Sequence, residues 1–134
     1  CQSSAETAGQ AQAYSAMRHL AHVIGAGKGD LGEATSYATK ALGGLEELLG
    51  RRHVTTLQAV NTLGWLCHLT GDSARAEALA QEAADGRREL LGRHHEDTLT
   101  SLGLLASVLR ANSTSDLSAL ASVYSELVAA QQEV

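Results

Sequence analysis

The chain repeats itself at an offset of 42 residues, and this repeat restricts the fold more than any other feature. Leu-Leu-Gly-Arg stands at residues 48–51 and again at 90–93, while Gly-Asp stands at 29–30 and 71–72. Three alanines follow each Gly-Asp pair at the same spacing: Ala34, Ala38, Ala41 and Ala76, Ala80, Ala83. Repeats of this length are typical of solenoids, in which each unit packs only on its neighbours. The sequence therefore predicts a linear array of similar units.

Each unit is predicted to hold two helices. In the middle unit, apolar residues recur at three- and four-residue spacing over about 55–69, which is typical of one buried helix face. Second helices are expected to begin after residues 29–30, after 71–72 and, more loosely, after Ser115-Asp116, because an Asp at these positions caps free backbone N–H groups. They are expected to end near Leu49, Leu91 and Ala130. The three first-helix stripes are Leu57, Val60, Leu63, Gly64, Cys67; Leu99, Leu102, Leu105, Ala106, Leu109; and, with one residue inserted in the 25–29 loop, Tyr14, Met17, Leu20, Ala21, Ile24.

The last second helix carries larger residues than the alanines of the earlier ones. Its stripe is Leu117, Leu120, Tyr124, Leu127 and Val128. Terminal repeats are often atypical. We therefore expect the final helix to fill the space that a following repeat would occupy.

Composition agrees with closely packed helices. The chain has no Pro and no Phe, and its hydrophobic residues, 44% of the total, are mostly Leu, Ala and Val. The absence of Pro removes the strongest helix breaker and leaves Gly to mark the ends of elements. An all-α fold is predicted.

The alanine pattern and the linkers resemble a known family. Gly71, Ala76, Ala80 and Ala83 resemble the second half of a tetratricopeptide repeat, and residues 87–99 look like the linker of kinesin light chain-type repeats, which have a longer period than the usual ~34 residues. The resemblance implies a right-handed superhelical stack of about three helix-turn-helix repeats with six helices. It implies one domain over residues 1–134, with repeats at about 9–50, 51–92 and 93–134.

By the same resemblance, first-helix residues line a concave groove that binds a partner. The positions are Arg18, His22, Gln58, Asn61, Trp65, His68, Ser107 and Arg110, together with Ser15, His19, Thr62 and Thr100. The family's Pro after His is Val54 in one linker and Glu96 in the other, and its paired Asn survives only as Asn61. These departures speak against a general peptide clamp.

The groove contains the only Trp of the chain. Trp and Arg are enriched among residues that dominate binding energy, and Arg18 and Arg110 beside Trp65 would suit an acidic or carboxylate-bearing segment. The alternative is that Trp65 packs between repeats and the arginines are solvated.

The two linkers also predict a basic edge. Arg51 and Arg52 recur with Arg93 and His94 at the repeat spacing, near His53, Arg87, Arg88 and His95. Such an edge would dock an acidic partner or phosphate groups, or it is a solvated loop. No metal is expected here, because Cys or carboxylate ligands at suitable spacing are missing. No cofactor is expected either.

Charge and cysteine content narrow the function classes. A net charge of −5 argues against nucleic acid as a partner. No apolar stretch is long enough for a membrane span, and two Cys cannot build a disulfide framework, which favours a reducing compartment. Cys1 at the start suggests a processed form, a lipid-anchored mature protein, or a segment of something longer.

The sequence predicts a protein–protein interaction module that binds or scaffolds a partner through its helical repeats. No nucleophile, base and orienting group recur together, so an enzyme is not expected. The alternative is a structural subunit or assembly factor held in a larger complex through its convex face and ends. A third possibility is a slice of a longer solenoid, since three repeats are near the minimum for stability.

Overall fold

The computed structural model describes residues 4–27, 29–111 and 117–132, and within these ranges it contains six α-helices and no strand. The predicted all-α fold is confirmed. The helices are α1 (Ser4–Ala26), α2 (Leu31–Leu49), α3 (Val54–Thr70), α4 (Ser73–Leu91), α5 (Glu96–Ala111) and α6 (Leu117–Gln132).

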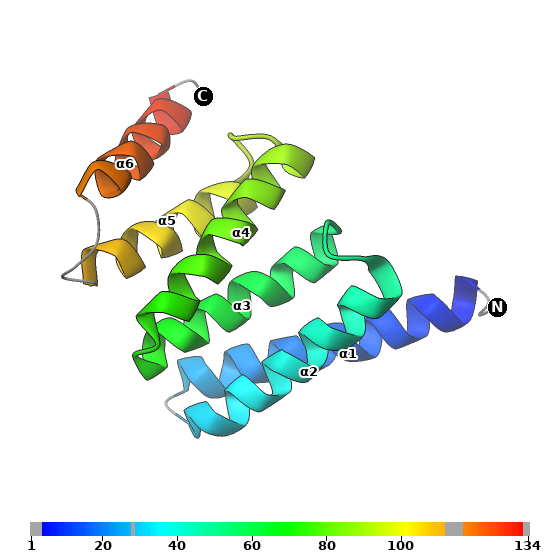
Figure 1. Ribbon diagram of the computed structural model, residues 1–134. Coiled ribbons are helices and arrows are strands. Elements are labelled where there is room, and N and C mark those ends of the chain that lie inside the picture. Colours follow the sequence, from blue (N-terminus) through cyan, green and yellow to red (C-terminus); the bar gives the residue numbers. More distant parts are fainter. Residues whose placement is uncertain (1–3, 28, 112–116, 133–134) are drawn as a thin grey trace.

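The helices pair as three hairpins that follow one another from α1–α2 at one end of the molecule to α5–α6 at the other (Figure 1). Neighbouring hairpins pack through α2 against α3 and through α4 against α5, and α1 also contacts α3. One core cluster spans α1 to α5, where Val108 belongs to it, and a second spans α4 to α6, with Leu104 packed against both. The apolar seam is therefore continuous between the hairpins.

The alanine stripes allow this close packing. All six alanines of the repeat, at 34, 38, 41, 76, 80 and 83, are fully buried. A methyl side chain adds little width between two helix axes, which favours close packing of the second helices on their neighbours.

The glycine of each Leu-Leu-Gly-Arg segment ends a second helix in a backbone conformation that other residues avoid. Gly50 has φ 87° and ψ 162°, and Gly92 has φ 92° and ψ 159°. This region is essentially restricted to Gly, because a Cβ would meet the neighbouring backbone. The repeated glycine is thus required by the linker geometry.

We expect Gly92→Ala to lower the free energy of unfolding by about 1–3 kcal/mol, the strain of a non-Gly residue in this region. Gly71, after α3, is the matched control, because its φ of 91° and ψ of 6° place it in the left-handed helical region. Asn tolerates that region, so Gly71→Asn should cost much less. Urea unfolding measures both variants, and equal losses would contradict the assignment.

Two aspartates cap the second helices as predicted. The Asp30 carboxylate accepts hydrogen bonds from the N–H groups of Gly32 (2.9 Å) and Glu33 (3.3 Å). Asp72 accepts one from the N–H of Arg75 at 3.3 Å. The third predicted cap, at 115–116, lies outside the described residues.

A histidine occupies the same place before two first helices. Nδ1 of His53 accepts the Thr55 N–H at 3.1 Å, and Nδ1 of His95 accepts the Asp97 N–H at 3.0 Å. Each imidazole thus satisfies one of the free N–H groups at a helix start. This explains why a His recurs in both linkers.

At the two ends of the stack, the structure departs from the predicted stripes. Leu20 was expected in the core of the first repeat but is 44% exposed, and Tyr124 and Val128 of α6 are 40% and 49% exposed. The expectation that α6 fills the space of a following repeat was therefore wrong for these two residues. Leu120 and Leu127 do pack inward, while the Leu117 side chain lies outside the described part. The reason is that no described helix covers the outer side of α1 or α6.

None of the described helices is both long enough and apolar enough to cross a lipid bilayer.

Candidate functional site

First helices of all three hairpins line one pocket of about 530 Å³. Seven of the residues predicted for the groove lie on its wall, one from α1, four from α3 and two from α5: His22, Asn61, Thr62, Trp65, His68, Thr100 and Ser107. The remaining lining residues are Leu69, Gly103 and Leu104. These side chains therefore share one concave pocket.

Trp65 both packs between hairpins and faces this pocket. Its ring is half-buried against the core, and a Cβ added to Gly25 at the end of α1 would come within 2.9 Å of it. The His22 ring lies 4.9 Å from the Trp65 ring, centroid to centroid, at an interplanar angle of 31°. The two interpretations of Trp65 are therefore compatible, since one edge of the indole packs while the other lines the pocket.

The His22 imidazole beside Trp65 has a lowered pKa. Burial lowers the pKa of His22 below its ordinary value of 6.5, and the positive charge of Arg18 and the neighbouring His19 lower it further. Its protonation state consequently responds to any charge that enters the pocket.

Arg18 of α1 does not line the pocket itself, but it contacts Thr62, which does. Its Nη1 donates to Oγ1 of Thr62 at 3.3 Å, and its Nε is buried with no hydrogen-bond partner among the described residues. Burial lowers the Arg18 pKa. The guanidinium charge behind Thr62 favours an anionic group in the pocket.

A second guanidinium lies beneath the groove, and sequence reasoning assigned it to the basic edge. Arg87 of α4 is only 5% exposed. Its Nη1 donates to the Asp97 carbonyl at 3.0 Å and to Oγ of Ser101 at 2.9 Å, and that hydroxyl donates to Oδ1 of Asn61 at 2.8 Å. Burial lowers the Arg87 pKa, Asp97 raises it, and Arg18 lowers it. The positive charge of Arg18 therefore acts on the Arg87 guanidinium.

The repeat itself indicates that Arg87 is buried. At the offset of 42 residues, Arg87 corresponds to Leu45, which is fully buried in the first repeat. A residue at that register position points into the array, not into the linker. The network also orients Asn61, whose amide nitrogen makes no hydrogen bond within the described residues and lines the pocket.

Five of the predicted groove residues do not line the pocket: Ser15, Arg18, His19, Gln58 and Arg110. Arg110 is exposed in the last turn of α5 and does not line it. Gln58 is half-buried near the start of α3, and its backbone carbonyl accepts from the Thr62 hydroxyl at 3.0 Å. The cation opposite Arg18 is therefore Arg87, not Arg110.

No carboxylate lies among the described residues of the pocket wall, although the chain carries an excess of acidic residues. Its polar groups are imidazole, amide and hydroxyl groups, with two arginines behind them. The local field accordingly favours anionic or carboxylate-bearing groups.

Family comparison agrees with this geometry. The tetratricopeptide repeat family profile matches residues 10–89, more than half of the chain. The chain belongs to the tetratricopeptide repeat family. A comparison with curated proteins returned no match. Tetratricopeptide repeats are non-catalytic modules that generally mediate protein–protein interaction and scaffolding.

On the linker side of the tetratricopeptide array, the structure corrects the predicted basic edge. Arg51 is held between Glu46 and Glu82, and the hydrogen bond to Glu82 is the main cause that raises its pKa. Arg52 pairs with Glu89 at 3.2 Å. Arg93 and His94 are exposed in the second linker. Since Arg51 and Arg52 already have carboxylate partners, they do not form a free basic surface.

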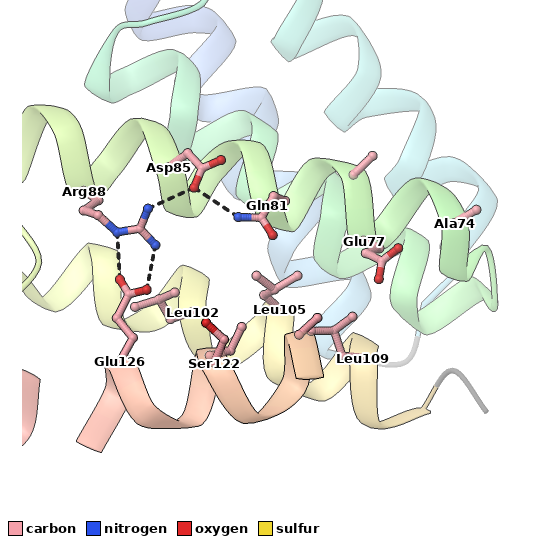
Figure 2. A pocket seen from close by; sticks show the side chains of 13 residues that line it. Ala74, Glu77, Gln81, Asp85, Arg88, Leu102, Leu105, Leu109, Ser122 and Glu126 are labelled. Carbon is pink, nitrogen blue, oxygen red and sulfur yellow. Dashed lines mark hydrogen bonds and ion pairs between the residues drawn. The ribbon is translucent and has the colours of Figure 1, made fainter. Parts of the chain in front are cut away.

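A second pocket, of about 480 Å³, lies on the second-helix side between α4 and α6, with α5 as its floor (Figure 2). Leu102, Leu105 and Leu109 form the apolar floor. Arg88 closes one end of the pocket. It forms a bidentate ion pair with Glu126 (2.7 and 2.9 Å) and a hydrogen bond to Asp85 (3.0 Å). The rim of this pocket thus carries Glu77, Asp85 and Glu126 beside Arg88, whereas the described residues that line the groove include no carboxylate.

Metal ligation finds no support in the described part of the chain. No group of three or more His, Cys, Asp or Glu side chains there is arranged to hold an ion. His53 and His95 accept backbone N–H groups through Nδ1 instead. Cys67 is buried, and burial raises the pKa of its thiol.

Proposed function

We propose that this tetratricopeptide array binds an acidic or carboxylate-bearing segment of a partner protein in the groove lined by His22, Asn61 and Trp65. The observation that carries the proposal is a pocket whose described lining residues include no carboxylate, with the guanidinium groups of Arg18 and Arg87 behind its wall. The positive charge of these two groups favours an acidic ligand in the pocket. Trp65 supplies the apolar contact typical of binding hot spots.

The proposal extends to the type and organisation of the array. The period of 42 residues and the shared linkers, with Gly50 and Gly92 in one conformation and His53 and His95 as caps, support the kinesin light chain type. We place the three repeats at about 9–50, 51–92 and 93–134 in one domain of residues 1–134. The protein acts as a non-catalytic adaptor in a reducing compartment.

Arg18 and Arg110, which were both predicted to line the groove, provide a test. Trp65, the only Trp, reports by its fluorescence on titration with Glu- and Asp-rich peptides and with Lys-rich peptides of equal length. We expect binding of the acidic set only. Loss of a hydrogen bond to a charged group costs about 1.5–3 kcal/mol, so Arg18→Ala should weaken binding by roughly tenfold or more, while Arg110→Ala should leave it nearly unchanged.

Two further readouts complete the test. The pKa of His22, followed by NMR, should rise when an acidic peptide is bound, because a nearby negative charge favours imidazolium. A melt of each variant separates weakened binding from unfolding. Equal affinities for acidic and Lys-rich peptides, or a larger effect of Arg110→Ala than of Arg18→Ala, would refute the groove as an acidic-segment site.

A second candidate is a structural subunit or assembly factor of a larger complex. The pocket between α4 and α6, with its apolar floor and the acidic side chains Glu77 and Asp85 on its rim, favours contacts on the convex side (Figure 2). Crosslinks from second helices to a partner, with no effect of Trp65→Ala, would select this function over the first.

A further inference from the structure

One face of α1 carries apolar residues that no described residue covers. Ala13, Ala16, Leu20 and Val23 follow one another at three- and four-residue spacing, and all four are exposed, Leu20 by 44% and Val23 by 51%. This spacing places them on a single stripe of the helix. Such a stripe normally faces another helix.

The same register positions are buried in the other two repeats. With the one-residue insertion in the first loop, Leu20 corresponds to Leu63 and Leu105, each 1% exposed. The other equivalent residues are fully buried: Thr56, Ala59, Leu66 in α3 and Thr98, Ser101, Val108 in α5.

In these two repeats, the preceding second helix covers these positions. Thr56 donates to the Leu45 carbonyl of α2, and Ser101 accepts from Arg87 of α4. The stripe on α1 is therefore a surface shaped for a second helix.

The opposite end of the molecule presents the complementary surface. Tyr124 and Val128 of α6 are 40% and 49% exposed and line a pocket of about 490 Å³ with Ala121, Ser125 and Ala129. Aligned on their capping positions, Tyr124 and Val128 correspond to Ala80 and Ala84 of α4, which are fully buried in one core cluster with Leu102 and Leu105 of α5. The outer face of α6 is thus shaped for a first helix.

We propose that copies of this chain associate head to tail, with α1 of one copy on the outer face of α6 of the next. The joint continues the interfaces that α2 forms with α3 and α4 with α5. It covers both unpartnered stripes at once, and neither stripe carries a charged residue.

Residue sizes fit a joint between copies. Tyr124 is much larger than Ala80, its counterpart inside the array. The incoming α1 offers the smaller Ala13 and Ala16 where α5 has Thr98 and Ser101. The added volume on one side is therefore offset on the other, as close packing requires.

A head-to-tail contact uses two different surfaces, so it gives rings or open filaments instead of closed dimers. Sedimentation from about 10 µM to about 1 mM should show the mean mass of the wild type rising with concentration beyond that of a dimer. A wild type that stays monomeric throughout this range overturns the proposal.

Two charge substitutions test the direction of the joint. Val23→Glu blocks the α1 face and Val128→Glu blocks the α6 face, so each variant alone should be monomeric. Their mixture retains one intact face of each kind and should form a heterodimer that grows no further. If Val128→Glu alone still dimerises, the contact is symmetric through α1 and the head-to-tail joint is wrong.

Ser36→Glu, an exposed position in the middle of α2, adds the same charge away from both ends and should associate like the wild type. If it is monomeric, charge alone explains the other variants and the joint is refuted. Circular dichroism checks that every variant folds, and Val23→Lys with Val128→Lys repeats the mixing experiment with the opposite charge. The groove residues are unchanged throughout, so failure of this joint leaves the peptide titration unaffected.

Discussion

Arg87→Ala should lower the free energy of unfolding by about 3 kcal/mol, whereas Arg88→Ala next to it should cost about 1 kcal/mol or less. Arg87 is 5% exposed and donates to a part-buried carbonyl and a buried hydroxyl, so its loss leaves a cavity and two weakened acceptors. Arg88 makes more ion pairs, but solvent screens them near the surface. Urea unfolding of both variants measures the difference, and a larger loss for Arg88→Ala would contradict it.

Arg87→Leu separates the structural role of this residue from its role in the groove. Leu is the residue at the equivalent position of the first repeat, where Leu45 is fully buried. Replacing a buried charge by an apolar side chain of similar size is often neutral or stabilising, so this variant should be more stable than Arg87→Ala. It should still bind acidic peptides more weakly, since Asn61 loses the network that orients it. Full affinity in Arg87→Leu would remove Arg87 from the proposed site.

Gly44→Ala and Gly43→Ala should have opposite effects, although the two glycines are adjacent in α2. A Cβ on Gly44 would clash with the Tyr14 ring of α1, while a Cβ on Gly43 meets nothing within 4 Å. Overpacking costs about 1–3 kcal/mol, and the gain in helix propensity is about 1 kcal/mol. We therefore expect Gly44→Ala to be destabilising by about 1–2 kcal/mol and Gly43→Ala to be stabilising by up to about 1 kcal/mol.

The same contact recurs one repeat later, which gives an internal check. A Cβ on Gly86 would lie 2.7 Å from Cδ1 of Leu57, and Leu57 holds the register position of Tyr14. Gly86→Ala should therefore also be destabilising, by less than Gly44→Ala because a Leu side chain changes rotamer more easily than a ring moves. Thermal melts rank the three variants, and a stabilised Gly44→Ala would show that Tyr14 does not lock α1 onto α2.

Local sequence patterns were sufficient to predict the helices, and the resemblance to tetratricopeptide repeats predicted most of the residues that line the groove. The ends of α2 and α4 follow from Asp30 and Asp72 as caps and from the glycines that terminate each helix. The resemblance to tetratricopeptide repeats assigned His22, Asn61 and Trp65 to one strip, and the three side chains line one pocket. The one-residue insertion between the first two repeats could also be inferred from the sequence, because it lies in a glycine-rich loop.

The partners of the long charged side chains were decided only by the packing of hairpins. An arginine reaches several neighbours from one backbone position, and its choice depends on distances between helices that periodicity does not encode. Arg51 therefore lies between two glutamates and Arg87 under the groove, while Arg110 stays at the surface. The exposed stripes at both ends have the same origin, since no hairpin within the described residues covers Leu20 or Tyr124 as the neighbouring hairpins cover their buried counterparts.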